Sequence, residues 1–331
     1  MGNINHRISL LNNLKQYLQE DCPEWQEIKE RAHAANAWFE QEFIDLAVKN
    51  IIENYLQPDI LGAFAGRYPE IQQPARTVGV VMAGNIPLVG FHDFLCTFLS
   101  GQHLMIKPSS KDEILITQVI KKMQEWDADI IQTIKIAERL IGCDAYIATG
   151  SNNSGRYFEY YFRKFPSIIR KNRTSLAILH GDESEEDLEK LADDCLLYFG
   201  LGCRNVTSLM VPEGYDFVPF LQAFRKYEWM KDHAKFRNNF DYQLALSIMN
   251  NEMYMTNEII LLRQHSSFYS PISVIHYQEV NAPDLHRIKI ENEAQLQQIT
   301  AKNATPFGTG QSPAIDDFAD GIDTMQFLTS L

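Results

Sequence analysis

Three short apolar runs constrain the fold of this chain more than any other feature. They are TVGVVMA at 77–83, HLMIK at 103–107 and AYIATG at 145–150, and each is followed by turn residues and then by a stretch with helical spacing. Strands that alternate with helices build parallel sheets, because right-handed crossovers return the chain to the same edge. The order predicts an α/β fold with parallel-rich sheets.

Periodicity and turn residues predict the other elements. In the first half we expect helices at 6–20, from Pro23 to about Phe39 or on toward Tyr55, and at 88–99, 110–126, 130–141 and 154–165, with a loop or edge pairing at 62–74. In the second half we expect strands at 175–179, 205–211, 259–263 and 272–277, and helices at 184–199, 217–227, 240–251 and 292–301. The pattern divides the chain into an N-terminal helical segment (1–60), two α/β domains (61–173 and 174–314) and a C-terminal tail (315–331) that packs or pairs with a neighbour.

Composition excludes several functional classes. The chain has 331 residues and a net charge of -13, which opposes attraction to nucleic acid or anionic lipid. It contains no signal-peptide pattern and no apolar run of the roughly 18 residues that a membrane span needs. The five cysteines are scattered without a CxxC pair, and no His/Cys spacing suggests a metal. We therefore expect a cytoplasmic protein with free thiols and no metal.

Cys203 is the strongest candidate for covalent chemistry. It stands in Gly200-Leu201-Gly202-Cys203, between a predicted helix and a predicted strand, where small neighbours allow a ligand to approach the backbone. A thiol there can act as a nucleophile, because cysteine is partly ionised near neutral pH and amide dipoles lower its pKa further. A lone cysteine is also often a buried structural residue, and that alternative stays open at this point.

Three further segments end strands at the ligand-binding edge of a parallel sheet. Asn85, in AGNIP, could donate its amide to an oxyanion or be a turn asparagine. Lys107, which precedes Pro108, Ser109 and Ser110, could bind ribose or phosphate or end its strand in an ordinary turn. Gly150 and Ser151 open a helix whose amides could meet a pyrophosphate, although this spacing alone is weak evidence.

Taken in order, these segments resemble the signature series of the aldehyde dehydrogenase superfamily. VGVVMAGNIP resembles its oxyanion-asparagine loop, MIKPSS its cofactor-lysine segment, ATGSNNSG its phosphate turn and GLGCRNVTSL its nucleophile loop. YSPISVIHY and KNATPFGTGQ resemble two later motifs, so that the resemblance covers roughly residues 60–331. It implies an aldehyde dehydrogenase-like fold, with 61–173 as the cofactor-binding domain and 174–314 as the catalytic domain that carries the nucleophile loop.

The departures from that pattern indicate a particular branch. The superfamily's water-activating glutamate, in an ELGG motif, is replaced here by the stretch IRKNR at 169–173, and a ribose-binding glutamate is replaced at about Ser267. Loss of the base favours transfer of the thioester to or from coenzyme A rather than to water. RKNRTSLAIL, GLGCRNVTSL and ADGIDTMQFL resemble the LuxC-like acyl-CoA reductases.

The resemblance implies reduction of an acyl-CoA, of fatty acyl type, to an aldehyde. Cys203 would attack the carbonyl and release CoA, while Asn85 and the Cys203 amide would stabilise the oxyanion. Competing hypotheses are a hydrolytic aldehyde dehydrogenase, a cysteine acyltransferase or thioesterase, and a noncatalytic nucleotide-binding subunit. The resemblance also suggests a homo-oligomer, a dimer or larger, formed through a C-terminal strand.

The implied cofactor is a nicotinamide nucleotide. Lys107, with Ser109 and Ser110, would hold the adenosine ribose or its phosphate, and Gly150 with Ser151 would meet the pyrophosphate. Ser110 occupies the position at which members that prefer NAD often carry a glutamate. Because no carboxylate would repel a 2′-phosphate there, we expect NADPH to be preferred over NADH.

Overall fold

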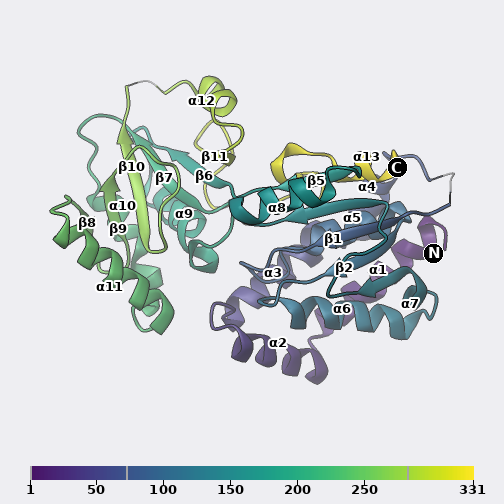
Figure 1. Cartoon of the computed structure of the whole chain (residues 1–331). Helices are drawn as coiled ribbons and strands as arrows, with labels where there is room; N and C mark the ends of the chain where they lie inside the picture. The colour runs from purple at the N-terminus through teal and green to yellow at the C-terminus, as the bar shows by residue number, and fades with distance from the viewer. Residues whose placement is uncertain (1, 72–73, 282) are drawn as a thin grey trace. The chain divides into compact units, whose positions relative to one another are not determined.

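The computed structural model of the chain describes residues 2–71, 74–281 and 283–331, and it divides into two compact units (Figure 1). Unit 1 contains Met1–Asn172 together with Pro313–Leu331, and unit 2 contains Arg173–Ser312. The chain therefore leaves unit 1 once and returns to it, so that unit 2 is a continuous insertion.

Unit 1 is built on a five-stranded sheet with the order β3-β2-β1-β4-β5, in which every pairing is parallel. The strands are β1 (Thr77–Val81), β2 (His103–Lys107), β3 (Ile134–Ile136), β4 (Ala145–Thr149) and β5 (Ser167–Arg170). Val78 and Val80 of the central strand are fully buried. The expected α/β fold with a parallel-rich sheet is confirmed for this part of the chain.

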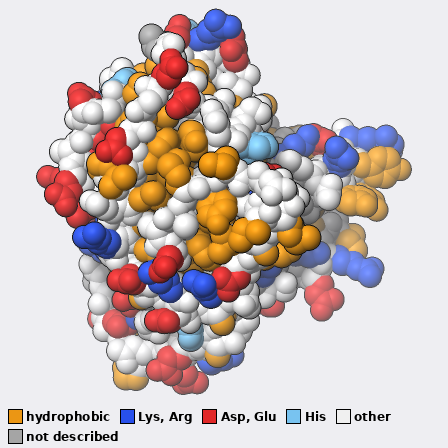
Figure 2. All heavy atoms as spheres, turned by 90° about the vertical axis from the view of Figure 1, so that its left-hand side faces the viewer, with side chains coloured by type: hydrophobic (Ala, Val, Ile, Leu, Met, Phe, Trp, Pro, Cys, Tyr) orange, Lys and Arg blue, Asp and Glu red, His pale blue; other side chains and the backbone are white. Residues whose placement is uncertain are grey.

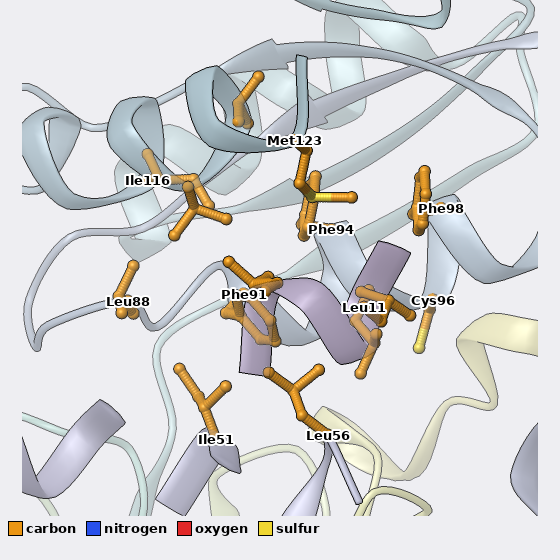
Figure 3. Packing of buried hydrophobic residues seen from close by; sticks show 14 of the residues in the cluster. Leu11, Ile51, Leu56, Leu88, Phe91, Phe94, Cys96, Phe98, Ile116 and Met123 are labelled. Atoms are coloured by element: carbon orange, nitrogen blue, oxygen red, sulfur yellow. The ribbon is translucent and has the colours of Figure 1, made fainter. Parts of the chain in front are cut away.

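The helices of unit 1 supply the apolar faces that cover this sheet. They are α1 (Ile4–Glu20), α2 (Pro23–Ala35), α3 (Gln41–Asn54), α4 (Pro58–Ala65), α5 (Phe91–Ser100), α6 (Glu113–Trp126), α7 (Ile130–Thr133), α8 (Asn152–Phe162) and, near the C-terminus, the short turn η3 (Ala319–Gly321) and α13 (Thr324–Thr329). One buried cluster joins Leu11 of α1, Ile51 of α3, Phe94 and Phe98 of α5 and Met123 of α6 (Figure 3). The N-terminal helices thus share a core with the sheet.

Unit 2 contains a six-stranded sheet with the order β11-β6-β7-β10-β9-β8, parallel except for the antiparallel edge pair β8 and β9. Its strands are β6 (Thr174–Ile178), β7 (Val206–Val211), β8 (Met255–Thr256), β9 (Leu261–Gln264), β10 (Val274–Glu279) and β11 (Leu296–Thr300). Its helices and short turns are α9 (Glu185–Leu196), η1 (Leu197–Gly200), α10 (Val218–Ala223), η2 (Phe224–Lys231), α11 (Ala234–Met249) and α12 (Leu285–Glu291). Ser184 and Asp187 form a reciprocal capping box at the start of α9, as the sequence predicts for a helix beginning there.

Two expected helices are wrong because a neighbouring strand offers a parallel partner. The expected helix at 130–141 ends at Thr133, and Ile134–Ile136 then pairs with β2 as the edge strand β3. The expected helix at 292–301 is strand β11, which pairs with β6, and its Leu296 and Ile299 are buried. In both places, pairing with a strand outside the segment overrides the local periodicity.

The N-terminal and C-terminal expectations also need correction. The helix that begins at Pro23 ends at Ala35, and a separate helix starts at Gln41. The expected loop at 62–74 begins inside α4, whose Leu61 and Phe64 are buried. The C-terminal tail ends in helix α13, whereas the expected oligomer contact required a C-terminal strand. Met325 and Leu328 of this helix belong to the unit 1 core.

The surface of unit 2 carries several large apolar side chains. Figure 2 shows apolar side chains gathered on one face of the molecule. On α11 and the turn that follows it, Tyr242 is 60% exposed, Ile248 58%, Met249 76% and Met253 89%. No helix in the described residues is long and apolar enough to cross a membrane.

Candidate active site

The carboxyl ends of three neighbouring strands in unit 1 carry the residues predicted to hold a cofactor. β1 lies between β2 and β4, and Val81 pairs with both Lys107 and Ala148. The Met82 N–H donates to the Lys107 carbonyl at 3.0 Å, so that the two chain segments stay paired to the end of the sheet. The turns that contain Asn85, Lys107 and Gly150 therefore leave adjacent strands at one edge.

The first two turns touch at Gly84 and Ser109. A Cβ atom on Gly84 would lie 2.6 Å from both Cβ and Oγ of Ser109, closer than real side chains approach. Only glycine fits at this position without a shift of one turn. The Asn85 loop and the Lys107–Ser110 segment are thus in direct contact, and the geometry of one limits that of the other.

The Asp112 side chain is hydrogen-bonded to the loop that contains Asn85. Its Oδ2 accepts the Leu88 N–H at 2.7 Å, whereas its buried Oδ1 has no hydrogen-bond partner. Burial raises the pKa of the Asp112 carboxyl well above its usual range, against the opposite effect of the Leu88 N–H. Leu88 itself has a left-handed φ of 54°, so the Asp112 side chain anchors an unfavourable backbone conformation.

Lys107 ends β2 with an exposed side chain. No carboxylate in the described part of the chain forms an ion pair with its ammonium, so the charge is available to an anionic or hydroxylic ligand. Ser110 is exposed as well, and Ser109 is half-buried beside Gly84. This segment presents a cation and two hydroxyl groups without a fixed carboxylate.

The third turn opens helix α8 after β4. The Ser151 hydroxyl caps the helix by accepting the Ser154 N–H at 3.2 Å. The first turn of a helix contains N–H groups without intrahelical acceptors, and those of the exposed Asn152 and Asn153 are left for solvent or a ligand. A Cβ atom on Gly150 would meet Ser154 at 2.9 Å. The turn is therefore tight.

In the IRKNR stretch at 169–173, which is expected to replace the superfamily's water-activating glutamate, Arg170 has a structural role. This residue ends β5, is 3% exposed and forms an ion pair with Asp93 of α5 at 2.6 Å. Burial alone lowers the pKa of Arg170, but the negative charge of Asp93 and its hydrogen bonds raise that pKa above the usual value. A paired guanidinium cannot accept a proton from water, so this side chain cannot act as a general base.

In unit 2 the predicted nucleophile, Cys203, lies in the turn between η1 and β7 and is partly exposed. None of the five cysteines forms a disulfide. The Ser175 hydroxyl on β6 donates to the Cys203 carbonyl at 3.0 Å. Strand β6 therefore fixes the backbone of the turn at the residue that carries the thiol.

The segment that leads into this turn has unusual backbone angles. Tyr198, Phe199 and Gly200 all have left-handed φ values, of 56°, 58° and 72°. Only glycine adopts this region without steric penalty, and each non-glycine residue there costs about 1 to 3 kcal/mol. Phe199 is fully buried and packs its ring against Trp229, His233 and Phe236. Packing therefore holds the strained segment in place.

A buried carboxylate links α9 to the late PFGTGQ stretch. Asp194 accepts the N–H groups of Gly308 at 2.7 Å and Gly310 at 3.0 Å. Burial raises the pKa of Asp194 to about 6, although the two N–H donors act in the opposite direction. The helix before the Cys203 turn and the glycine-rich loop after β11 are thus connected through one side chain.

Sequence reasoning missed four residues that hold these segments in place: Asp93, Asp112, Ser175 and Asp194. All four are buried polar residues. A polar residue near a glycine-rich motif hints at such a role, but its partners come from other elements and become visible only in the fold. No group of three or more His, Cys, Asp or Glu side chains suited to a metal occurs among the described residues.

Solved aldehyde dehydrogenases have the same fold. A NAD-dependent benzaldehyde dehydrogenase from Corynebacterium glutamicum is 14% identical, with a TM-score of 0.64 over 91% of this chain and 77% of that one. Glyceraldehyde-3-phosphate dehydrogenase from Methanocaldococcus jannaschii, complexed with NADP, is 14% identical, with a TM-score of 0.64 over 90% and 76%. Lactaldehyde dehydrogenase from Escherichia coli is 13% identical, with a TM-score of 0.66 over 91% and 74%. The molecule therefore has an aldehyde dehydrogenase-like fold.

The family model described as acyl-CoA reductase (LuxC) matches residues 4–216. Because the match covers more than half of the chain, the protein belongs to this family, and the resemblance identified from the sequence is confirmed. No curated protein matches the chain. Family membership and the fold together support an oxidoreductase activity in aldehyde chemistry.

Proposed function

We propose that this protein reduces an acyl-CoA to the aldehyde with NADPH, through a thioester on Cys203. The observation that carries the proposal is the combination, in an acyl-CoA reductase family member, of a partly exposed thiol in an anchored turn with a buried, paired Arg170 in the stretch that replaces the water-activating glutamate. An acyl-enzyme without that base is suited to exchange with a thiol rather than with water.

The first half of the reaction uses residues of this chain alone. The Cys203 sulfur forms a bond to the acyl carbonyl carbon, and the bond from that carbon to the CoA sulfur breaks. The CoA thiolate leaves and takes up a proton, which balances the proton that the Cys203 thiol loses. In this proposal the Asn85 amide and the Cys203 N–H donate to the oxyanion, which lowers the barrier to both bond changes.

The strand ends of unit 1 suit a nicotinamide nucleotide. The Lys107 ammonium has no ionic partner in the described residues, and the Gly150–Ser151 turn opens a helix of eleven residues with unused N–H groups. Lys107, Ser109 and Ser110 would hold the ribose and its phosphate, and Ser151 with the following amides the pyrophosphate. When bound, the reduced nicotinamide would supply the hydride to the acyl carbon, and the bond from that carbon to the Cys203 sulfur would break to free the aldehyde and restore the thiol. Overall, acyl-CoA, NADPH and a proton become aldehyde, CoA and NADP⁺.

The test is NADPH oxidation with a panel of acyl-CoAs, with aldehyde and released CoA both measured. We expect Cys203→Ala to abolish both products. Cys22→Ala is the matched control, because Cys22 is also partly exposed but lies at the start of α2, and it should keep full activity. Release of CoA without NADPH consumption would instead identify an acyltransferase or thioesterase, and aldehyde oxidation without CoA would identify a hydrolytic dehydrogenase.

Cofactor preference is tested at Ser110. The native chain should have a higher kcat/KM with NADPH than with NADH. Ser110→Glu should reduce the ratio at least tenfold, because its carboxylate would repel a 2′-phosphate and accept a ribose hydroxyl instead. A clear preference of the native chain for NADH would contradict this part of the proposal.

A further inference from the structure

Asn205 forms more hydrogen bonds to the Cys203 turn and its flanks than any other side chain described above. It is fully buried, two residues after Cys203 and immediately before β7. Its Oδ1 accepts the Gly202 N–H at 2.7 Å. Its Nδ2 donates to the carbonyls of Asp194 at 3.0 Å and Leu197 at 2.9 Å, with a longer contact to that of Cys195 at 3.4 Å. One amide thus connects both sides of the turn.

The Asn205 nitrogen and oxygen bind different parts of the turn. The last carbonyls of an α-helix have no intrahelical donors, and Nδ2 meets such carbonyls where α9 ends. The Oδ1 atom fixes the residue directly before Cys203. The Asn205 backbone is held as well, since its N–H donates to the Gly202 carbonyl at 3.1 Å and its carbonyl accepts the Ser175 N–H at 3.1 Å.

Between these anchors lies the left-handed segment of Tyr198, Phe199 and Gly200. Strained backbone persists only where its surroundings fix it, and strain of this kind clusters at functional sites. If the Asn205 amide were removed, the end of α9 and the turn could relax independently. The direction of the Cys203 Cα–Cβ bond would then vary.

We propose that Asn205 is a positioning residue, whose side-chain amide fixes the turn and so aims the Cys203 thiol and the adjacent backbone at the acyl carbonyl. Because its Oδ1 accepts the Gly202 N–H, that N–H does not donate to the oxyanion in this proposal. This role rests on the proposed function only for its catalytic consequence. The geometry of the thiol can be tested without any reductase activity.

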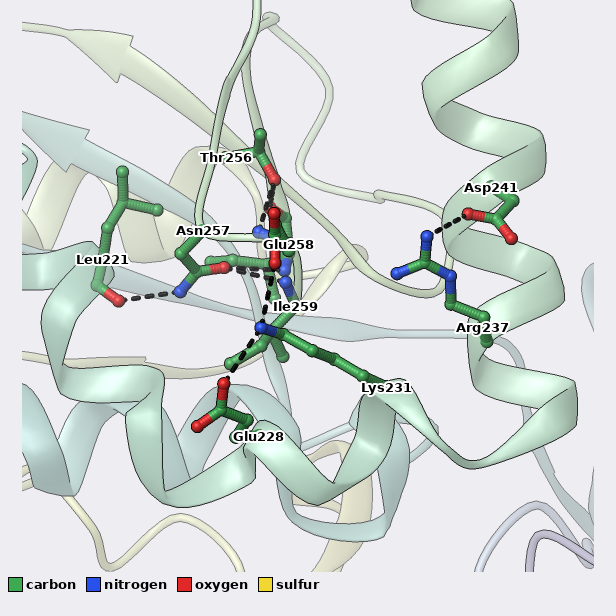
Figure 4. Close-up of polar contacts among 10 residues, drawn as sticks. Leu221, Glu228, Lys231, Arg237, Asp241, Thr256, Asn257, Glu258 and Ile259 are labelled. Carbon is green, nitrogen blue, oxygen red and sulfur yellow. Dashed lines mark hydrogen bonds and ion pairs between the residues drawn. The ribbon is translucent and has the colours of Figure 1, made fainter.

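The chain contains a matched control in Asn257. Its Oδ1 accepts the N–H groups of Ile259 and Ile260, both at 3.0 Å, and its Nδ2 donates to the Leu221 carbonyl at 2.7 Å (Figure 4). Asn257 therefore anchors a turn of unit 2 with the same chemistry. That turn carries no predicted site residue, so Asn257→Ala should affect stability but not chemistry.

The experiment compares Asn205→Ala with Asn257→Ala in two assays, both in the full chain. In acyl-CoA reduction, we expect Asn205→Ala to lower kcat at least tenfold with KM for acyl-CoA changed less than threefold, and Asn257→Ala to change neither more than twofold. In iodoacetamide alkylation across pH, in a Cys22→Ala background, we expect Asn205→Ala to change the rate or apparent pKa of Cys203 and Asn257→Ala to leave both unchanged. Equal effects of the two variants in both assays would overturn the proposal.

A milder variant covers the case in which Asn205→Ala does not fold. Ser175→Ala removes only the hydroxyl that donates to the Cys203 carbonyl, and it should lower kcat about threefold to tenfold while the chain stays folded. An unchanged kcat and alkylation profile in this variant would contradict positioning by the anchored turn. The native chain and all the variants could fail to reduce acyl-CoA while their alkylation profiles still differ as expected. In that case the positioning role of Asn205 stands and the proposed function fails.

Discussion

The guanidinium of Arg170 forms hydrogen bonds to both carboxylate oxygens of Asp93. Its Nη1 lies 2.8 Å from Oδ1 and 2.6 Å from Oδ2, and its Nη2 donates to the Thr324 hydroxyl at 2.8 Å. Strand β5, helix α5 and helix α13 meet at this one cation. Arg170 therefore ties the C-terminal helix to the sheet.

Breaking this buried pair should destabilise the protein strongly. Arg170→Met leaves the Asp93 carboxylate buried without its partner, and we expect the free energy of unfolding to fall by about 3 to 5 kcal/mol. Urea denaturation measures the loss. Arg170→Met combined with Asp93→Leu should regain most of it, because no charge then remains buried. Removal of the exposed Lys190–Glu186 pair should have a much smaller effect.

The contact between Gly84 and Ser109 predicts a double-mutant result. Gly84→Ala places a methyl group 2.6 Å from Ser109 and should lower the free energy of unfolding by about 1 to 3 kcal/mol. Ser109→Gly in the same chain should restore at least half of that loss. Gly62→Ala serves as the control, since nothing lies within 4 Å of its added methyl group. Failure of Ser109→Gly to compensate would show that the two turns do not touch.

Asp112 should be replaceable by asparagine but not by alanine. Asp112→Asn keeps an oxygen for the Leu88 N–H, whereas Asp112→Ala leaves that buried donor unpaired, which costs about 1 to 3 kcal/mol. Thermal denaturation of both variants at pH 7 tests this. Equal destabilisation by the two substitutions would mean that the carboxyl does not anchor the loop.

Asp194 gives stability a specific pH dependence. Its pKa is raised by burial to about 6 in the folded state, above the usual value of 3.8. The folded state therefore holds this proton longer than the unfolded state does, and stability falls as pH rises from about 4 to 6. The loss should reach roughly 2 to 3 kcal/mol relative to Asp194→Asn, whose side chain does not titrate. Parallel stability curves for the two chains over this range would contradict the assignment.

Local patterns predicted most of the helices and strands, because residues within or beside many of these elements determine where they begin and end. Strand β2 has the predicted boundaries, and Ser184 begins α9 through its own capping box. Strand β11 was missed because its partner lies far away in sequence. Gln298 pairs with Ser175 across more than a hundred residues, and no local periodicity encodes such a contact.

The candidate site divides in the same way. Asn85, Lys107 and Cys203 stand in recognisable turns, so their order along the chain indicated their positions. Asn205 and Asp112 could not be assigned, because their roles depend on which backbone groups the fold places beside them. The side chains that hold these turns are therefore recognised only in the tertiary structure, whereas the three turn residues are proposed from motifs.

The insertion of unit 2 also sets the order in which the two units are completed during synthesis. When residue 312 has been added, the whole of unit 2 exists, but unit 1 still lacks Met325 and Leu328, which are 2% and 0% exposed in its core. Arg170 cannot form its hydrogen bond to Thr324 until the whole of unit 2 has been translated. The core of unit 1, whose first strands are made before unit 2, is therefore completed only after the whole of unit 2 has been synthesised.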